Sequence, residues 1–361
     1  MTTAERLLRA DLRDFRGYVS ARSTRQEGSV WLNANESALP SLADPDGTSQ
    51  RYPEPQPAEL LKRLAAHYQV EPAQLLAGRG SDEGIDLLVR TFCEPGDGCV
   101  LIAPPTFGMY AVSAKLHGAQ VIEVPLLDTP RGFLHDLDAL ATHTLEAKAS
   151  LVFLCNPGNP TGATLDPGAI SQLARRLAGR SLLVIDEAYG EYGDVASASR
   201  LLGAHDNIVV LRTLSKAHAL AGARIGCVMA QASVIALLRR VQAPYPLAAP
   251  CIGMVLKALQ PTALSELVDR IAVVRKERKI LHKRLSGLDG VRCAYPSSGN
   301  FLLVRFDDAA AILARLLQAG IVVRDMRAYE GLDDALRISI GTPTENAAVV
   351  AVIEGNARVS A

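Results

Sequence analysis

Apolar residues along the chain follow two alternating patterns, which together predict a sheet with helices between its strands. Short, continuous apolar runs end abruptly in polar residues, and between them apolar residues recur at the spacing of one helix face. Strands that are apolar throughout are typical of a mostly parallel sheet buried on both faces, whose carboxyl-end loops build a site. The predicted strands are 75–77, 99–103, 120–124, 150–155, 182–185, 208–211 and 225–229, with helices at about 82–93, 107–117 and 168–178.

The pattern changes after about residue 260, where it predicts a smaller α+β domain. Residues 261–286 carry one apolar stripe at helical spacing and predict a single long helix. Shorter strands and helices then follow, in the order strand, strand, helix, strand, strand, helix. They are predicted at 291–295, 301–306, 308–319, 321–324, 336–340 and 343–356.

The N-terminal part predicts little regular structure. Residues 1–30 indicate an arm with one short helix, 31–37 a short strand, and helical spacing resumes at Pro57 after a proline-rich loop. A chain of 361 residues also exceeds the roughly 250–300 at which a single core stops growing. We therefore expect an arm (1–30), a large domain (31–260) and a small domain (261–361), with which the arm could also pack.

Charge and cysteine usage narrow the possible partners. Lys plus Arg and Asp plus Glu both number 38, so bulk charge favours neither nucleic acid nor an anionic membrane, and any anion site has to be local. No apolar stretch is long enough to span a membrane, and the charged N-terminus lacks a signal core. The six cysteines and seven histidines show no metal-ligand spacing. These features predict a cytoplasmic protein with reduced cysteines and no metal site.

Lys216 stands in an unusual position for a solubilising lysine. It comes just after the strand 208–211 and a short polar turn, with Ser215 beside it and Arg224 eight residues on. We interpret Lys216 as a covalent catalyst. The alternative is an ordinary strand-end lysine that pairs with an acid.

Asp186 and Tyr189 follow another apolar run, 182–185. An acid directly after a buried strand needs a cationic or N–H partner to stay charged, and a protonated pyridine nitrogen would serve. Such a pair would make the ring an electron sink. Tyr189 could then bond a phenolate oxygen of the same ring. The alternatives are a helix-capping aspartate and a core tyrosine.

A glycine-rich stretch, 78–84, opens the helix predicted at 82–93. Free N–H groups and the helix dipole favour a phosphate there, although the spacing G-x-G-x-x-x-G is neither a dinucleotide fingerprint nor a P-loop. A tight turn alone is the alternative. The predicted phosphate ligands are Gly80, Ser81, Asp82 and Glu83, and Ser215 and Arg224 could complete the anion site.

The heptad NPGNPTG (156–162) is a rigid turn at a strand end, because its prolines fix φ and its glycines allow tight turns. It would present Asn159 at a defined place, beside Tyr189. Together with Lys216, Asp186 and the phosphate loop, these residues predict pyridoxal phosphate as cofactor. The pKa of Lys216 would have to fall for imine exchange near neutrality.

These motifs carry a family resemblance that spans nearly the whole chain. NPGNPTG, DEAY and SKAHALAGARIG resemble fold-type I aminotransferases. LNANES, RYPEPQ, GRGSDEGIDLLVR, PPTFGMY and TLSKAHALAGARIG are similar, more closely, to the histidinol-phosphate aminotransferase family. The resemblance implies a fold-type I α/β transferase with a mostly parallel seven-stranded sheet and a small α+β domain. It also implies a homodimer with each site at the subunit interface.

The implied reaction moves an amino group between histidinol phosphate and 2-oxoglutarate or glutamate, in histidine biosynthesis. Lys216 would be the Schiff-base lysine and proton shuttle. By the same resemblance Phe107 would stack on the cofactor ring, and Tyr52 would reach the cofactor phosphate of the neighbouring subunit. The resemblance also implies five substrate ligands. Arg324 would bind the substrate phosphate and Arg337 the substrate carboxylate, and the other three are Tyr18, Asn35 and Asn159.

His218 departs from the family pattern, in which an aromatic residue, often Phe, is usual. We interpret it as a packing substitution. Related activities on the same fold remain open at this stage: an aromatic amino acid aminotransferase and a threonine-phosphate decarboxylase. A ligand sensor would need an added DNA-binding domain, for which the arm is too short, and a nucleotide-binding dehydrogenase is excluded by the glycine spacing.

Overall fold

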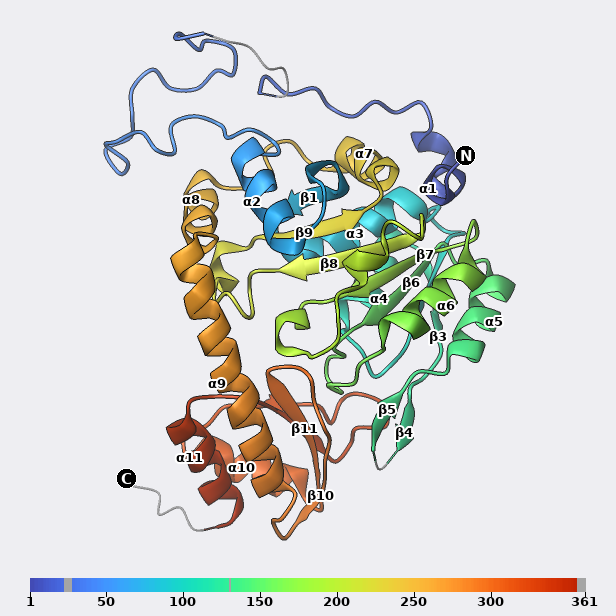
Figure 1. Cartoon of the computed structure of the whole chain (residues 1–361), viewed down its shortest axis with the longest axis vertical. Coiled ribbons are helices and arrows are strands. Elements are labelled where there is room, and N and C mark those ends of the chain that lie inside the picture. The colour runs from blue at the N-terminus through green and yellow to red at the C-terminus, as the bar shows by residue number, and fades with distance from the viewer. Residues whose placement is uncertain (23–27, 130, 356–361) are drawn as a thin grey trace.

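A computed structural model of the chain describes residues 1–22, 28–129 and 131–355. Its centre is one seven-stranded sheet, in the order β1-β9-β8-β7-β6-β2-β3 (Figure 1). All neighbours from β8 to β3 pair in parallel, and only β9 runs against its two neighbours. The prediction of a mostly parallel sheet is thus confirmed. The strands are β1 (Leu75–Gly78), β2 (Cys99–Ile102), β3 (Gln120–Glu123), β6 (Leu151–Cys155), β7 (Leu182–Asp186), β8 (Ile208–Thr213) and β9 (Gly226–Ala230).

Helices cover both faces of this sheet, because successive strand residues point to opposite sides. Leu183 and Ile185 of β7 join one apolar core, and Leu182 and Val184 join the other. On the first side lie α2 (Ala58–Tyr68), α5 (Leu137–Ala147), α6 (Pro167–Leu177) and α8 (Ala249–Ala258). On the second lie α1 (Thr3–Leu7), α3 (Gly80–Phe92), α4 (Met109–His117) and α7 (Ala232–Val241).

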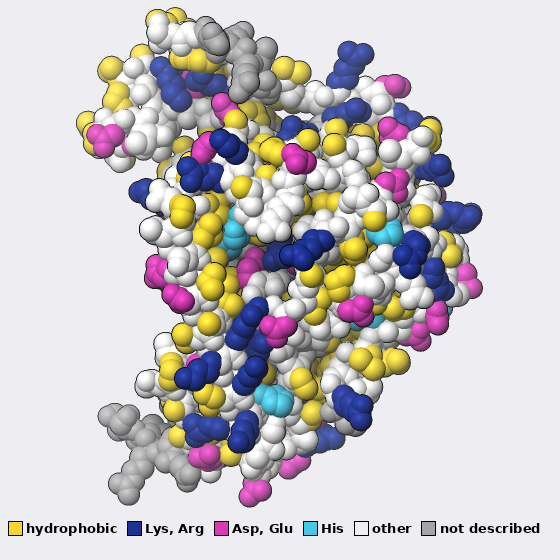
Figure 2. Space-filling view, in the orientation of Figure 1, with side chains coloured by type: hydrophobic (Ala, Val, Ile, Leu, Met, Phe, Trp, Pro, Cys, Tyr) yellow, Lys and Arg dark blue, Asp and Glu magenta, His cyan; other side chains and the backbone are white. Residues whose placement is uncertain are grey.

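A long helix, α9 (Pro261–Leu285), leads from the large sheet to a second, four-stranded antiparallel sheet (Figure 1). Basic side chains gather along its exposed face (Figure 2). The second sheet has its own apolar core. Its elements are β10 (Val291–Ala294), β11 (Phe301–Phe306), α10 (Ala309–Gln318), β12 (Arg324–Asp325), β13 (Ala335–Ser339) and α11 (Pro343–Ile353).

A hairpin of β4 (Leu127–Thr129) and β5 (Gly132–Leu134) extends from the large sheet and packs against the small one (Figure 1). Phe133 lies against Tyr295, with ring centroids 4.9 Å apart. The Tyr295 hydroxyl donates to Asp128, 2.7 Å away, and Asp128 also pairs with Arg305. The sequence did not predict this contact, nor α5, α7 and α8.

The first residues of the N-terminal arm lie against the large domain. The Thr3 hydroxyl donates to Asp206 at 2.8 Å, and Arg9 donates to the carbonyl of Arg90 at 2.7 Å. Helix α1 of the arm packs on α7 of the large domain, and packing of the arm with the small domain stays a prediction. Residues 23–27 of the arm lie outside the described residues.

The strand predicted at 31–37 is wrong: those residues are in irregular structure, and their polar side chains bond neighbouring loops. The last helix ends at Ile353, and residue 356, its predicted end, lies outside the described residues. Short 3-10 turns complete the fold: η1 (Ala10–Leu12), η2 (Pro72–Gln74), η3 (Gly190–Tyr192), η4 (Ala198–Leu201) and η5 (Ala221–Ala223).

Among the described helices, none is by itself long and apolar enough to cross a membrane. Helices α8 and α9 meet that length and composition only as a pair, which is bent by 73° at the break between them.

Candidate active site

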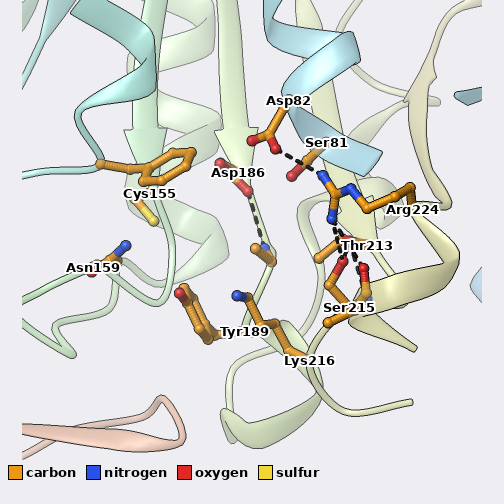
Figure 3. Close-up of a pocket in the computed structure, with 13 residues that line it drawn as sticks. Ser81, Asp82, Cys155, Asn159, Asp186, Tyr189, Thr213, Ser215, Lys216 and Arg224 are labelled. Carbon is orange, nitrogen blue, oxygen red and sulfur yellow. Dashed lines mark hydrogen bonds and ion pairs between the residues drawn. The ribbon is translucent and has the colours of Figure 1, made fainter. Parts of the chain in front are cut away.

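A pocket of about 140 Å³ lies at the carboxyl ends of β6, β7 and β8 (Figure 3). Parallel neighbours end at one edge of the sheet, so residues far apart in sequence meet there. The start of α3 forms its opposite wall. The lining residues are Ser81, Asp82, Phe107, Cys155, Asn159, Asp186, Ala188, Tyr189, Thr213, Ser215, Lys216, Ala221 and Arg224.

Lys216 points its amino group into this pocket (Figure 3). Its Nζ lies 5.7 Å from the centre of the Tyr189 ring. Burial, followed by the guanidinium of Arg337, lowers the pKa of Lys216 below its usual value. In the part of the chain that the structure describes, Lys216 forms no ion pair with an acid. The structure therefore does not support the alternative interpretation of Lys216 as a strand-end lysine that pairs with an acid.

Asp186 is the last residue of β7 and is only 1% exposed. One carboxylate oxygen accepts from the Tyr110 hydroxyl at 2.7 Å, and the other accepts from the Ala188 N–H at 3.1 Å. Burial nevertheless raises the pKa of Asp186 to about 6. A buried carboxylate of this kind is stabilised by a cation brought into the pocket, as a pyridinium N–H would be.

Tyr110, in α4, holds Asp186 through its hydroxyl, a contact that the sequence did not predict. Its ring stacks on Phe153 with centroids 4.9 Å apart, and it meets the edge of Phe107. Burial and the charge of Asp186 hold the pKa of Tyr110 well above its usual value, so the hydroxyl stays a donor. The only sequence signal for Tyr110 is its position three residues after Phe107, at helical spacing. An ordinary core tyrosine would have the same spacing, so this signal does not identify it.

The glycine-rich stretch and Arg224 lie together at one end of the pocket. Helix α3 begins at Gly80, so the N–H groups of its first turn have no partners within the helix. Arg224 donates to Asp82 at 3.0 Å and to the Ser215 hydroxyl at 3.4 Å (Figure 3). Ser81 also lines the pocket. Donors from α3, Ser215 and Arg224 thus converge where a phosphate would fit.

Gly226 explains how β9 comes so close to this helix start. A Cβ at Gly226 would lie 2.7 Å from the carbonyl carbon of Gly80 and 2.8 Å from the N of Ser81. The same Cβ would lie 2.6 Å from the carbonyl oxygen of Arg212 on β8, so any larger residue would displace β8 or the first turn of α3. The predicted ligand Glu83 points elsewhere: its carboxylate binds the side chain and N–H of Arg79. Glu83 could therefore offer a phosphate only its backbone N–H.

Asn159 and Arg337 connect the large sheet to the small one at the pocket. The Asn159 side-chain oxygen accepts from Arg337, which turns the amide nitrogen to other partners. Arg337 also lies over the Phe301 ring at 5.4 Å. Arg324 is the register partner of Arg337 on the adjacent strand but is exposed and does not line the pocket.

Three predicted site residues lie away from this pocket. Tyr52 is 49% exposed and stacks on Tyr245, with centroids 4.3 Å apart. Tyr18 is 74% exposed and lines a separate surface cavity with Tyr52. Asn35 lines a neighbouring cavity. None of the three lines the pocket that holds Lys216 of the same chain.

A buried ion cluster lies next to the pocket, and the sequence did not predict it. Arg212, on β8, contacts Glu187 at 2.7 Å and Glu191 at 3.0 Å. Both acids belong to the turn that carries Asp186 and Tyr189. Arg212 therefore ties that turn to the strand that leads to Lys216.

His218 lies behind the Lys216 loop, with its ring 5.2 Å from that of His67. Burial lowers the pKa of His218 to about 4, so it is neutral at physiological pH. Its two ring nitrogens have no hydrogen-bond partner among the described residues. Such a side chain packs and does not titrate near neutrality.

The arrangement described above is that of an aminotransferase. The family model for aminotransferases of class I and II matches residues 25–353, and the chain belongs to this family. The histidinol-phosphate aminotransferase of Xanthomonas euvesicatoria pv. vesicatoria is 56% identical to it over 348 residues, 96% of each chain. That of Stenotrophomonas maltophilia is 56% identical over 347 residues, 96% of this chain and 95% of the relative.

Solved structures show the same fold. The crystal structure of histidinol-phosphate aminotransferase from Sinorhizobium meliloti in complex with pyridoxal-5'-phosphate matches with a TM-score of 0.77 at 26% identity, over 90% of either chain. L-threonine-O-3-phosphate decarboxylase from Porphyromonas gingivalis matches at 0.71 and 21% identity, over 87% of this chain and 93% of that one. The second likeness concerns the fold alone.

Proposed function

We propose that the protein is a pyridoxal phosphate-dependent aminotransferase that interconverts histidinol phosphate plus 2-oxoglutarate with imidazole acetol phosphate plus glutamate, a step of histidine biosynthesis. The observation that carries this proposal is the 56% identity with a histidinol-phosphate aminotransferase over 96% of both chains. The convergence of Lys216, Asp186 and the start of α3 on one pocket supports it.

The pocket residues suit pyridoxal phosphate, whose ring, when bound, withdraws electrons from the substrate carbon that exchanges its proton. Lys216 would carry the covalent link and then move that proton with its Nζ, which a lowered pKa favours. Asp186 would hold the ring nitrogen protonated. Tyr189 and the amide nitrogen of Asn159 would donate to the phenolate oxygen. Phe107 would lie against the ring face.

Phosphate binding would use the first turn of α3 with Ser81, Ser215 and Arg224. The ion pair between Arg224 and Asp82 is half exposed, so Arg224 can exchange it for a phosphate. On the substrate side, Arg337 would bind the carboxylate of glutamate. Arg324, its register partner, would bind the phosphate of histidinol phosphate once the two parts of the chain close on it.

We also propose a homodimer in which Tyr52 reaches the cofactor phosphate of the neighbouring subunit. The chain between α1 and α2 projects from the body (Figure 1), and apolar side chains gather on it (Figure 2). Single apolar residues are common on surfaces, but several exposed on one projecting segment favour a protein partner. The exposed apolar residues of this segment are Phe15, Tyr18, Val19, Val30, Leu32, Leu39, Leu42 and Tyr52. A cytoplasmic location is part of the same proposal and is supported by the six free cysteines.

The test begins with the purified protein and pyridoxal phosphate. We expect a visible absorption band that borohydride fixes to Lys216 and that Lys216→Ala abolishes. Initial rates are then compared for histidinol phosphate, phenylalanine and threonine phosphate. A protein that stays colourless contradicts the cofactor assignment. A phenylalanine rate that is higher by orders of magnitude contradicts the substrate.

A further inference from the structure

The chain between Leu12 and Ala58 contains no helix or strand among its described residues. A segment of this length without regular structure is uncommon in a compact protein and usually serves a function. Its backbone cannot hold its own shape through a helix or sheet. The Tyr52 ring stacks on Tyr245, and other interactions have to fix the backbone that carries it.

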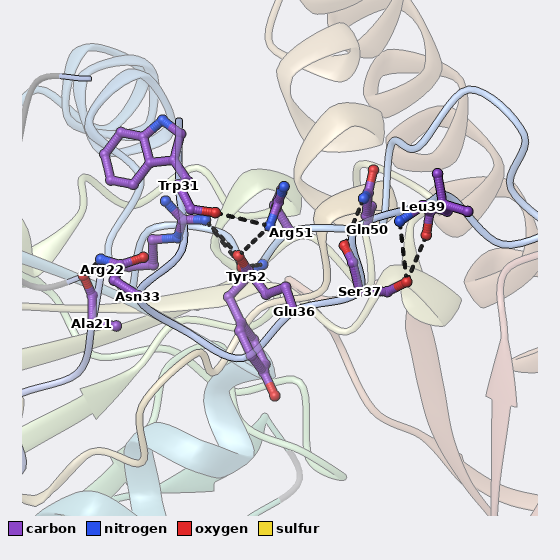
Figure 4. A network of polar contacts seen from close by, with 10 residues as sticks. All are labelled: Ala21, Arg22, Trp31, Asn33, Glu36, Ser37, Leu39, Gln50, Arg51 and Tyr52. Atoms are coloured by element: carbon purple, nitrogen blue, oxygen red, sulfur yellow. Dashed lines mark hydrogen bonds and ion pairs between the residues drawn. The ribbon is translucent and has the colours of Figure 1, made fainter. Parts of the chain in front are cut away.

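Glu36 holds this backbone (Figure 4). Its side chain is only 3% exposed, and its two oxygens accept from Arg22 at 3.0 and 2.9 Å. Arg51 donates at 2.9 Å, and the backbone N–H of Tyr52 donates at 2.8 Å. One carboxylate thus joins stretches that lie fourteen and sixteen residues away from it along the chain.

Hydrogen bonds keep the Glu36 carboxylate in its charged form. Burial alone would raise the pKa of Glu36, but the hydrogen bonds from Tyr52, Arg22 and Arg51 outweigh burial and bring it below its usual value. Arg22 in turn lies over the Trp31 ring at 4.4 Å. Hydrogen bonds to ionised partners are stronger than neutral ones, so the cluster holds its members firmly.

The cluster orients an outward-facing surface. Tyr52 and Tyr18 line one cavity of about 750 Å³ together with Arg22 and Trp31. Neither tyrosine faces the Lys216 pocket of its own chain. A surface that is already ordered in the free subunit loses less conformational freedom when a partner binds.

We propose that Glu36 is a positioning residue that holds Tyr52 in the geometry needed by the active site of a second copy of the chain. This inference rests on the proposed homodimer with Tyr52 acting in trans. Glu36 touches neither cofactor nor substrate in this arrangement. It acts on the neighbouring site through the Tyr52 backbone.

The first measurement is cofactor retention by the holoenzyme. After dilution, borohydride is added at intervals and the cofactor fixed to Lys216 is measured. We expect Glu36→Gln to release cofactor roughly tenfold faster or more, because the charged hydrogen bonds are lost. Asp46→Asn is the matched control: it removes the same charge from an exposed position in the same segment and should release cofactor like the wild type.

Hybrid dimers separate a trans effect from general loosening. In a hybrid of Glu36→Gln with Lys216→Ala, the only Lys216 is on the chain that lacks Glu36, but the partner supplies an intact Glu36 and Tyr52. Retention at that site should return to the wild-type value. In the reciprocal hybrid, a wild-type chain pairs with a chain that carries both substitutions, and retention should stay impaired. Equal retention in both hybrids overturns the proposal.

Tyr52→Phe shows which idea has failed if the expected results do not appear. If Tyr52→Phe retains cofactor like the wild type, the trans role of Tyr52 is wrong, and the inference falls with it. If Tyr52→Phe is impaired while Glu36→Gln behaves like Asp46→Asn, only the role of Glu36 is wrong. Should Glu36→Gln not fold, Arg51→Gln removes one of the donors at a side chain that is 40% exposed and replaces it in the same hybrids.

Discussion

The hydrogen bond from Tyr110 to Asp186 offers a direct test of how the pocket sets the charge of its acid. Burial raises the pKa of Asp186 from 3.8 to about 6, against the pull of the Tyr110 hydroxyl and the Ala188 N–H. Because the folded-state pKa is raised, this group's stabilisation is present below pH 4 and is lost as the pH rises through 6. The shift corresponds to about 3 kcal/mol of unfolding free energy.

Tyr110→Phe removes one hydrogen bond and leaves the ring stack with Phe153 in place. Below pH 4 the lost partner is a neutral acid, and we expect a cost of about 1 kcal/mol. Above pH 7 the lost partner is a carboxylate, and the expected cost is about 2–3 kcal/mol. The difference means that the pKa of Asp186 rises by about one further unit.

The assay is urea unfolding of the cofactor-free protein between pH 4 and 8, at one protein concentration. The destabilisation by Tyr110→Phe should grow with pH. Tyr68→Phe is the control, because the buried Tyr68 hydroxyl has no hydrogen-bond partner among the described residues. Its effect on stability should not follow the titration of Asp186. A destabilisation by Tyr110→Phe that is the same at every pH would refute the reasoning.

Three further outcomes are expected. Arg212→Met leaves Glu187 and Glu191 buried without their cation and should cost about 3–5 kcal/mol of unfolding free energy in urea titrations, with partial recovery in Arg212→Lys. Gly226→Ala places a Cβ against the start of α3 and should weaken pyridoxal phosphate binding, measured by fluorescence titration, at least tenfold; unchanged affinity would show that this helix end is not a phosphate site. Lys216, whose pKa is lowered by burial, should react with an amine-directed reagent at lower pH than exposed lysines in the cofactor-free protein, as followed by peptide mass spectrometry.

The pattern of apolar runs was a sound guide to the buried sheet, because strands covered on both faces leave little room for polar residues. β11 was predicted with its observed bounds, 301–306. The hairpin of β4 and β5 was not predicted, because its strands are only three residues long and Leu127 and Leu134 are exposed. The strand at 31–37 was wrongly predicted, because that stretch finds its partners in Arg22 and Arg51 instead of a neighbouring strand.

The residues of the candidate site also include some that the sequence could predict and some that it could not. Residues at strand ends, such as Asp186 and Lys216, could be predicted to meet, because parallel strands end together. Tyr110 could not be separated from a core tyrosine, since only the fold brings it behind Asp186. The distance of Tyr52 from the Lys216 pocket was equally inaccessible, because nothing in the local sequence says which way an irregular segment projects.

The register of the central strands also limits how such a protein can diversify. Cys155, Asp186 and Leu211 are direct neighbours across β6, β7 and β8. Their backbones are therefore separated by the interstrand spacing of about 4.8 Å, which no side-chain substitution alters. The spacing between the acid and the strand that leads to Lys216 is thus fixed by the sheet. Under the proposed function, variation in substrate choice would come from Arg324, on the small sheet, and from the projecting segment, where insertions and substitutions leave that spacing unchanged.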